Sequence, residues 1–294
     1  MIVLGVLTKE ATHSQDEELK KLLEAKKAVI KIVGCGGAGG NTISRIMQVG
    51  IVGAETIVMN TDAQDLLYTD ADMKILIGKE ITGGLGAGSD PRIGEESAKE
   101  SRNEIKKVLQ GSDMVFVTCG LGGGTGTGAA PVVGRIAKEM GAIVIAAVTM
   151  PFKLEGARLI KAEEGLKQLR EVTDTVIVIE NQKLLDMGGK MPLKQAFGIA
   201  DNLIALMVKG LSEMISVPSL VNLDYADVKA IMRSGGVATI GVGESDTPNR
   251  ALDAVTRALS HPLLDVDYSN ATGALIQVIG GEDLKLDEIN VIGE

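Results

Sequence analysis

Aromatic residues, cysteine and histidine are all scarce in this chain of 294 residues. Three phenylalanines, three tyrosines and no tryptophan leave aliphatic side chains to build the core. Two cysteines are too few for a disulfide framework or a thiolate metal site. A zinc site or a serine-type catalytic triad would need one of only two histidines, which argues against both kinds of site.

Basic clusters and long apolar runs are missing as well. Acidic residues number 39 and basic residues 30, so the net charge is −9, and no basic block suited to a phosphate backbone is present. We therefore predict no nucleic-acid partner. No apolar run reaches about 18 residues, which predicts no direct membrane insertion. The apolar start, residues 1–7, is short and lacks a basic flank, so it is a poor signal peptide and we expect a cytoplasmic protein.

The body of the chain alternates between apolar strands and amphipathic helices. Strands are expected at 29–33, 56–60, 74–77, 113–118, 142–148 and 175–179, and helices at 41–49, 95–109, 129–140 and 155–171. This alternation predicts an α/β fold with a parallel sheet that has helices on both faces.

The flanking segments complete the expected domain organisation. A capped surface helix is predicted at 14–28, inside an N-terminal extension. A long helix at 192–216 carries an apolar stripe and should be buried between two layers; the stripe is Ile199, Leu203, Met207, Leu211 and Met214. A smaller α+β domain should follow, with strands at 236–242 and 273–279 and a helix at 248–260 that starts with Pro248. The expected units are the extension 1–28, a nucleotide-binding domain 29–191, the central helix and linker 192–220, and an incomplete second domain 221–294.

Glycine is abundant, at 37 of 294 residues or about 13% against a typical ~7%, and it gathers after the expected strands. The run GCGGAGGN at 34–41 contains G-x-G-x-x-G, whose backbone can approach a phosphate at a helix start. Alone, this run fits a Rossmann dinucleotide site equally well, since Asp62 lies where a ribose-binding acid is expected.

Two further glycine runs favour a nucleotide site of another kind. The run GGGTGTG at 122–128 also lies between a strand and a helix, and Thr125 and Thr127 could donate to phosphate oxygens. A third run, at 83–91, could close over a terminal phosphate. The chain has no G-x-x-x-x-G-K-[ST], and the three runs have no lysine. Charge neutralisation is therefore expected from backbone N–H groups and from Mg²⁺ on the phosphates, without direct protein ligation of the metal.

An acidic pair lies in the run NLDYAD at 222–227. Asp224 and Asp227 are three residues apart, so at a helix start both carboxylates share one face. They could simply cap the helix and complement its dipole. The alternative is a pair that polarises a water molecule.

Together these motifs resemble the FtsZ branch of the tubulin/FtsZ GTPases, the prokaryotic cell-division filament proteins, from about residue 29 to 294. GGGTGTG at 122–128 resembles the family's signature loop, and NLDYADVK at 222–229 its synergy loop. The resemblance implies a GTPase with GTP or GDP and Mg²⁺ as cofactors. It also implies head-to-tail polymerisation into filaments of a mid-cell division ring, with division-machinery and membrane-tethering proteins as partners in the family. Asn222, Asp224 and Asp227 would be catalytic, acting on the neighbouring subunit's GTP.

The resemblance also implies nucleotide contacts by position. The phosphates would lie against Gly36, Gly37, Ala38, Gly39, Gly40 and Asn41, and against Gly122, Gly123, Gly124, Thr125, Gly126, Thr127 and Gly128. Asn60, Asp62 and Ala63 would form a further nucleotide loop, and Gly86, Ala87 and Gly88 would lie near the γ-phosphate. Glu155 and Arg158 would contact ribose and phosphate, while Asn181 and Asp201 would recognise the guanine edge and Phe197 would stack on the base.

This chain departs from the family pattern at four places. Glu155-Gly-Ala-Arg158 is one residue shorter than the usual E-G-x-x-R, and one residue turns a helical side chain by about 100°. Glu180 stands where a proline commonly precedes the base-reading Asn, and Ser219 replaces a usual glycine. The sequence stops at Glu294, so the last helix and strands of the second domain and the tail peptide of the family are expected to be absent.

Two other functions remain open at this point, and the identity of the retained nucleotide and the dependence of phosphate release on protein concentration would separate them from the GTPase. A nucleotide-binding structural protein without hydrolysis would use the acidic pair as caps, and a Rossmann NAD(P) enzyme would use only the first glycine run. The expected 25-residue central helix spans about 37 Å, so the acidic pair cannot reach its own subunit's γ-phosphate.

Cys35 and Cys119 are expected to be free thiols that lie near each other. Bound nucleotide is expected to slow the alkylation of both.

Overall fold

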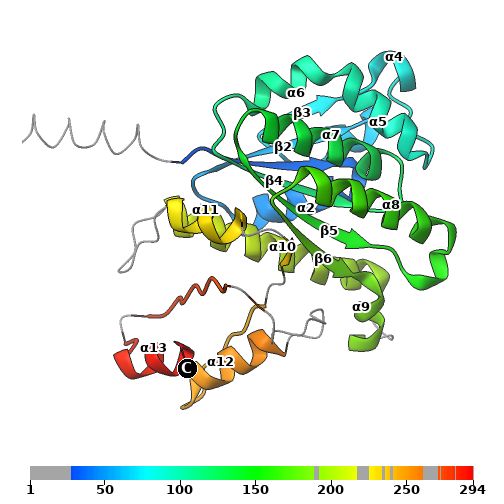
Figure 1. Cartoon of the computed structure of the whole chain (residues 1–294). Helices are drawn as coiled ribbons and strands as arrows, with labels where there is room; N and C mark the ends of the chain where they lie inside the picture. The colour runs from blue at the N-terminus through cyan, green and yellow to red at the C-terminus, as the bar shows by residue number, and fades with distance from the viewer. Residues whose placement is uncertain are drawn as a thin grey trace, which may run out of the picture.

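A computed structural model describes most of the chain (Figure 1). The described residues are 28–188, 192–216, 225–233, 236–238, 241–260, 271, 273–281 and 283–293. The helix expected at 14–28 lies, except for its last residue, outside them, and so do Ser219, Asn222 and Asp224. Within the described helices, none is long and apolar enough to cross a membrane.

Seven strands form a single sheet in the order β3-β2-β1-β4-β5-β6-β7, and every neighbouring pair is parallel. Their bounds are β1 (Ile30–Cys35), β2 (Ala54–Asn60), β3 (Met73–Leu76), β4 (Met114–Gly120), β5 (Ile143–Met150), β6 (Thr175–Glu180) and β7 (Gly236–Ala238). The predicted α/β fold is confirmed, and the six strands predicted between 29 and 179 are present to within three residues at each end.

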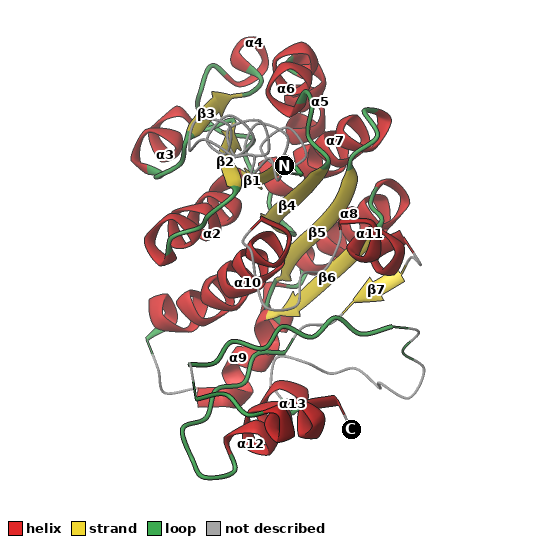
Figure 2. Cartoon of the chain, turned by 90° about the vertical axis from the view of Figure 1, so that its left-hand side faces the viewer, coloured by secondary structure: helices red, strands yellow, loops and turns green. Residues whose placement is uncertain are grey.

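Helices cover both faces of this sheet, as Figure 2 shows. The bounds of the helices are α2 (Gly36–Val49), α3 (Ala63–Tyr68), α4 (Lys79–Thr82), α5 (Pro91–Glu100), α6 (Arg102–Leu109), α7 (Thr125–Glu139), the 3₁₀ turn η1 (Lys153–Glu155), α8 (Ala157–Val172), α9 (Asn181–Gly188), α10 (Leu193–Ser216), α11 (Tyr225–Arg233), α12 (Arg250–Leu259) and α13 (Leu286–Gly293). One face carries α2, α3 and α10, and the other carries α5, α6, α7 and α8.

The strands feed two separate cores because successive side chains point to opposite faces. Cys35 and Met59 pack with Ile136 of α7 on one side. Phe116 packs on the other side, with Ile43 of α2 and other aliphatic residues of α2 and α10. The strands are therefore buried on both faces, which explains why their sequences are continuously apolar.

The prediction of a single helix at 95–109 is wrong in two respects. It is two helices, because Ser101 leaves the helical conformation and its Oγ accepts a hydrogen bond from the N–H of Gly78 at 3.1 Å. The first of them begins earlier, at Pro91, where Asp90 caps the helix by accepting from the N–H of Arg92 at 3.0 Å. An Asp-Pro pair is a helix-start signal that the apolar pattern alone did not reveal.

The long helix α10 lies between the sheet and the C-terminal part of the chain, as expected for 192–216. Leu203, Met207 and Leu211 of the predicted stripe are buried, whereas Ile199 and Met214 are only half-buried. On the opposite side the segment 273–281 passes over the helix, and a Cβ at Gly210 would lie 2.5 Å from Oε1 of Gln277.

The C-terminal part corrects three of the expected elements. Of the strand predicted at 236–242, residues 236–238 form β7, residues 241 and 242 are not in a strand, and the two between them lie outside the described residues. Strand β7 pairs with β6 of the large sheet rather than with a second sheet. The apolar run 273–279 forms no strand, because no neighbouring strand pairs with it among the described residues. The helix predicted at 248–260 is α12, which begins at Arg250 with Asn249 as its cap, so Pro248 is not its first residue.

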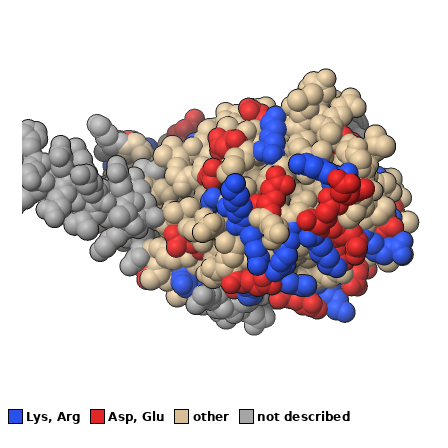
Figure 3. Space-filling view, turned by 90° about the horizontal axis from the view of Figure 1, so that it is seen from above, with Lys and Arg blue, Asp and Glu red and all other residues tan. Residues whose placement is uncertain are grey.

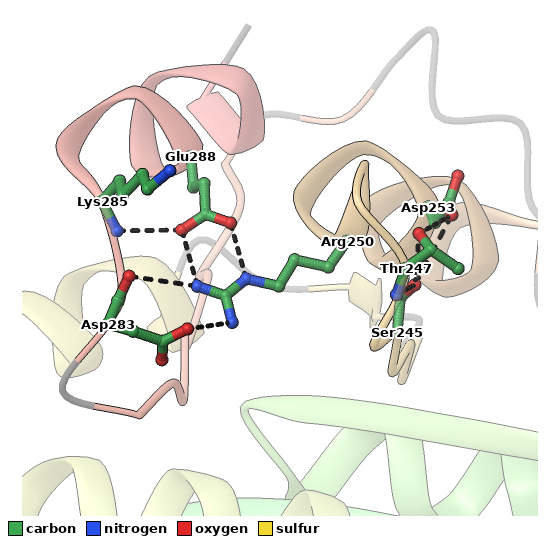
Figure 4. Close-up of polar contacts among 7 residues, drawn as sticks. All are labelled: Ser245, Thr247, Arg250, Asp253, Asp283, Lys285 and Glu288. Carbon is green, nitrogen blue, oxygen red and sulfur yellow. Dashed lines mark hydrogen bonds and ion pairs between the residues drawn. The ribbon is translucent and has the colours of Figure 1, made fainter.

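Arg250 joins α12 to α13 (Figure 4). Its guanidinium donates to both carboxylate oxygens of Glu288 at 2.6 and 3.0 Å and to Asp283 at 2.8 Å. The bonds from Arg250 lower the pKa of Glu288 to about 2.

The exposed face over α5 to α8 mixes both signs of charge (Figure 3), with ion pairs such as Arg102–Glu139 at 2.6 Å.

Candidate nucleotide site

The strand order creates a crevice at the carboxyl ends of β1 and β4. The helix after β1, α2, packs on one face of the sheet, and the helix after β4, α7, packs on the other. The two chain segments therefore diverge between neighbouring strands, which is where open α/β sheets bind ligands. A Cβ at Gly36 would lie only 2.9 Å from the backbone nitrogen of Gly126, so the first two glycine runs touch through their backbones.

The first two glycine runs form the first turns of helices rather than free loops. Helix α2 begins at Gly36 and α7 at Thr125, several residues before the expected starts at 41 and 129. Neither helix start has a side-chain cap. The N–H groups of both first turns are therefore available to an anion, and both helix dipoles present their positive ends to the same crevice.

Threonine hydroxyls connect the loops around this crevice. The hydroxyls of Thr61 and Thr125 lie 2.6 Å apart and join the loop after β2 to the start of α7. The N–H of Gly122 donates to Oγ1 of buried Thr127 at 2.9 Å, so this hydroxyl shapes its own loop. Asp62 accepts from the N–H groups of Gln64 and Asp65, which makes it the cap of α3.

The side-chain amide of Asn60 forms hydrogen bonds within the loop after β2. Its Oδ1 accepts from the N–H groups of Thr61 and Asp62 at 2.8 and 3.3 Å, and its Nδ2 donates to Asp65 at 2.7 Å. Ala63 follows as the first residue of α3 and donates its N–H to the carbonyl of Gly84 at 3.0 Å. The loop after β2 is thereby bonded to the third glycine run.

The third glycine run lies directly against the second. A Cβ at Gly124 would be 2.8 Å from Cβ of Ala87 and 3.0 Å from the nitrogen of Asp90. Gly86 donates its N–H to the carbonyl of Thr61 at 3.1 Å, and Lys161 of α8 donates to the carbonyl of Ser89 at 2.8 Å. The three runs that the sequence places far apart thus meet at one edge of the sheet.

Glu155 and Arg158 pair with each other at the entrance to α8. The Arg158 guanidinium donates to Oε2 of Glu155 at 2.8 Å, and Oε1 of Glu155 accepts from the N–H of Phe152 at 3.0 Å. The backbone of Arg158 also lies against Gly122, where a Cβ would meet its carbonyl oxygen at 2.8 Å. Arg158 therefore borders the second glycine run, with Glu155 paired to it.

Three residues with base-binding chemistry lie on α9 and α10. Asn181, the first residue after β6, is buried, and its Oδ1 has no hydrogen-bond partner in the described structure. Asp201 accepts a hydrogen bond from Oγ1 of Thr42 at 2.8 Å, and burial raises its pKa. Phe197 is 38% exposed, and its ring centroid lies 5.7 Å from that of Phe152.

These features fit a nucleoside phosphate. The unpaired N–H groups at two helix starts suit phosphate oxygens, the buried and unpartnered Asn181 suits a base edge, and the exposed Phe197 ring suits a base face. The part of the chain that the structure describes has no group of three or more His, Cys, Asp and Glu residues that could hold a metal ion.

Asp227 lies at the opposite edge of the sheet. Its helix, α11, is bonded to the amino ends of two strands: Tyr225 donates its hydroxyl to the carbonyl of Asp113, just before β4, at 2.7 Å. Thr175, the first residue of β6, donates to the carbonyl of Met232 at 2.9 Å. Asp227 itself is exposed. Figure 1 shows α11 at one end of the sheet and the strand ends that carry the glycine runs at the other.

The two cysteines are neighbours, as expected. Cys35 and Cys119 are register partners on β1 and β4, and both are free and buried. Burial raises the pKa of Cys35 to about 12 and that of Cys119 well above its ordinary value. Cys35 is the last residue of β1 and Cys119 the next to last of β4, and neither side chain is open to a reagent. The expectation that bound nucleotide slows their alkylation is therefore replaced: neither thiol should react in the native protein.

Two protein-family models match the sequence. The model of the Tubulin/FtsZ family, GTPase domain, matches residues 29–189, and that of the FtsZ family, C-terminal domain, matches 236–294. The chain is 61% identical over 280 residues to cell division protein FtsZ 1 of Thermococcus kodakarensis, covering 95% of this chain and 75% of that relative. It is 58% identical over 275 residues to FtsZ 1 of Methanocaldococcus jannaschii, covering 93% and 76%.

Solved structures agree with these matches. An FtsZ dimer from M. jannaschii superposes with a TM-score of 0.89 at 57% identity, covering 95% of this chain and 82% of that chain. A GTPγS-bound protofilament of CetZ2 from Haloferax volcanii gives a TM-score of 0.67 at 25% identity, covering 78% and 70%. The alternative function of an NAD(P) enzyme, which the first glycine run alone allowed, is therefore wrong. The chain belongs to the tubulin/FtsZ family of guanine-nucleotide-binding GTPases, and within it to the FtsZ cell division proteins.

Proposed function

We propose that this protein is a self-assembling GTPase that polymerises head to tail and hydrolyses GTP at the contact between subunits. The observation that carries the proposal is the separation of the candidate nucleotide site from α11. Asp201 precedes the end of α10 at Ser216 by 15 residues, or about 22 Å at ~1.5 Å per residue. Helix α11 is bonded to the amino ends of β4 and β6, whereas the glycine runs lie at the carboxyl ends of the strands. Asp227 therefore cannot touch a γ-phosphate bound in its own subunit.

The candidate site supplies separate groups for each part of GTP. The N–H groups that begin α2 and α7 would hold the phosphates, and the loop around Ala87 would cover the terminal one. Asn181 and Asp201 would accept and donate along the guanine edge, with Phe197 against the base. Mg²⁺ bound to the phosphates would neutralise their charge and needs no protein ligand.

Hydrolysis would then depend on a neighbouring subunit. Asp227, with Asn222 and Asp224 before it, would meet the next subunit's nucleotide and orient the attacking water, while the N–H groups stabilise the developing charge. Such a contact is heterologous, and it extends into an open filament unless its rotation closes a ring. Hydrolysis would in turn weaken the contact that made it possible.

Exposed apolar side chains around the nucleotide edge support a subunit contact there. Leu67, Tyr68 and Leu85 are 69, 80 and 88% exposed and lie on α3 and the third glycine run. The dimer and protofilament named above, each formed by a related protein, support the same interpretation. The cellular place of such a filament would be the cytoplasmic division ring at mid-cell.

The test is GTP turnover measured against protein concentration, with sedimentation in parallel. Turnover per subunit should rise steeply with concentration. Asp227→Ala should still bind GTP and sediment but lose turnover, whereas Asp287→Ala, which removes an exposed carboxylate from α13, should behave like the parent protein. Mixing Asp227→Ala with a GTP-binding-defective Gly124→Val variant should restore turnover, because each supplies the half that the other lacks.

Two outcomes would contradict the proposal. If dilute monomers hydrolyse GTP at the full rate, catalysis between subunits is wrong. If the parent protein binds GTP and sediments but releases no phosphate at any concentration, the protein is the non-hydrolysing structural alternative, and Asp224 and Asp227 serve only as helix caps.

A further inference from the structure

Thr42 is a buried polar residue for which the proposed function has no role. It lies in α2, six residues after the helix begins at Gly36, and it is 3% exposed. Its Oγ1 lies 2.8 Å from Oδ1 of Asp201 and 3.2 Å from the carbonyl oxygen of Ala38. The two partners are 159 residues and 4 residues away in sequence, so one contact is long-range and the other local.

The hydroxyl of Thr42 can donate one hydrogen bond, and the Asp201 carboxylate is the stronger of its two acceptors. A carboxylate is an anionic acceptor, and charge-assisted hydrogen bonds are shorter and stronger than neutral ones. The carbonyl of Ala38 already accepts the N–H four residues ahead in the helix. The shorter of the two distances therefore marks the hydrogen bond that matters for Asp201.

This bond counteracts the effect of burial on Asp201. Burial raises the pKa of Asp201, while the Thr42 hydroxyl and the nearby charge of Arg45 both lower it. Among the described residues, Arg45 of α2 is the charged side chain that acts on this carboxylate, and it also donates to Oδ1 of the adjacent Asn202 at 3.2 and 2.9 Å. Helix α2 thus holds two successive residues of α10.

Among the described residues, only one oxygen of the Asp201 carboxylate receives a hydrogen bond. Within the described structure Oδ1 takes the Thr42 proton, and no donor reaches Oδ2. A charged carboxylate with a free oxygen can accept from the N1–H and the 2-amino group of guanine, and a protonated one cannot accept from both.

We propose that Thr42 is a positioning residue that fixes the orientation of the Asp201 carboxylate and thereby sets the selectivity for guanine. It also connects base recognition to the helix whose first turn would hold the phosphates. The inference rests on the proposed function, in which Asp201 recognises the base, and it names the residue that makes this recognition selective.

The experiment compares the affinities for GTP and XTP across a pH series, by equilibrium dialysis on the full chain. Thr42→Val has nearly the same shape without the hydroxyl, and it should lower GTP affinity about tenfold near neutral pH. The pH below which GTP binding fails should move upward, because the bond that lowers the pKa of Asp201 is gone. Thr42→Ser keeps the hydroxyl and should restore both the affinity and the pH profile.

Thr173→Val is the matched control. Thr173 is equally buried and donates its hydroxyl to the carbonyl of Leu169 at 2.7 Å, at the far end of α8. This variant loses a buried hydrogen bond as Thr42→Val does, so its stability should fall, but its GTP affinity and pH profile should match those of the parent protein. Urea unfolding of all the variants checks that each is folded where its binding is measured.

Asp201→Asn separates the inference from the function on which it rests. Xanthine carries a carbonyl where guanine carries the 2-amino group, so the amide should favour XTP over GTP. If Asp201→Asn leaves the preference for GTP unchanged, Asp201 does not recognise the base and the proposed recognition fails. If Asp201→Asn switches the preference but Thr42→Val stays within twofold of the parent, or Thr42→Ser fails to restore binding, only the role of Thr42 is overturned.

Discussion

Replacing Gly94 by alanine should destabilise the protein although it improves the helix. Gly94 lies inside α5, where it faces the start of α7. A Cβ at this position would lie 2.4 Å from the carbonyl oxygen of Gly124 and 3.0 Å from Cα of Thr125. Both are backbone atoms, so no side-chain rotation can relieve the contact.

The net effect follows from two opposing terms. Alanine is better than glycine in a helix by about 0.5–1 kcal/mol. Against this, α5 must retreat by about 1 Å to restore normal contact, and overpacking of this kind costs about 1–3 kcal/mol. Because the whole α5–α7 contact opens with it, we take the upper end of that range, which leaves a net loss of about 2 kcal/mol.

Urea unfolding measures this loss as a lower midpoint with an unchanged slope. Gly198→Ala is the matched control, because Gly198 also lies inside a helix, α10, but a Cβ there would meet no atom within 4 Å. It should gain about 0.5–1 kcal/mol. Gly94→Ala should also weaken GTP binding, since Gly124 belongs to the second glycine run. A Gly94→Ala variant as stable as the Gly198→Ala control would refute the reasoning.

Three further predictions follow from the site and the ion pairs. Cys35 and Cys119 should not react with iodoacetamide in the native protein with or without GTP, because both are buried with raised pKa values; mass spectrometry would detect a contrary result as added mass. Phe197→Ala should weaken GTP binding by ~1–3 kcal/mol, and an unchanged affinity in calorimetry would exclude stacking. The free energy of unfolding should fall as the pH drops from 4.5, the ordinary pKa of a glutamate, towards about 2, the pKa of Glu288 in the folded protein. Urea unfolding should show a smaller fall in this free energy over the same pH interval for Arg250→Ala.

The strands and their parallel arrangement could be predicted because burial on both faces leaves a continuous apolar run, as in β4. The starts of α2 and α7 could not, because glycine disfavours helices and its abundance there indicates a loop. In the structure these glycines are needed for close backbone contact, as between Gly36 and Gly126. The run 273–279 shows the opposite error: its apolar residues favour a strand, but a strand also needs a neighbour with which to pair.

The contacts of the base-binding residues were beyond sequence reasoning. Thr42 and Asp201 meet only because α2 and α10 pack side by side, and no local pattern indicates that packing. The grouping of three glycine runs could be foreseen, since the carboxyl ends of parallel strands share one edge. The capping role of Asp62 could be foreseen less well, because the same residue also fits a ribose contact.

The position of α10 determines where the polypeptide can be cut. The match to the GTPase domain ends at residue 189, but α10 comes after it and covers one face of the sheet with Leu203, Ile204 and Val208, among other buried residues. Each buried aliphatic side chain is worth about 1.5–3 kcal/mol, so removing the helix would exceed the ~5–15 kcal/mol that stabilises a typical domain. A recombinant fragment that stops at residue 189 should therefore aggregate, and the shortest fragment able to fold by itself should extend through β7.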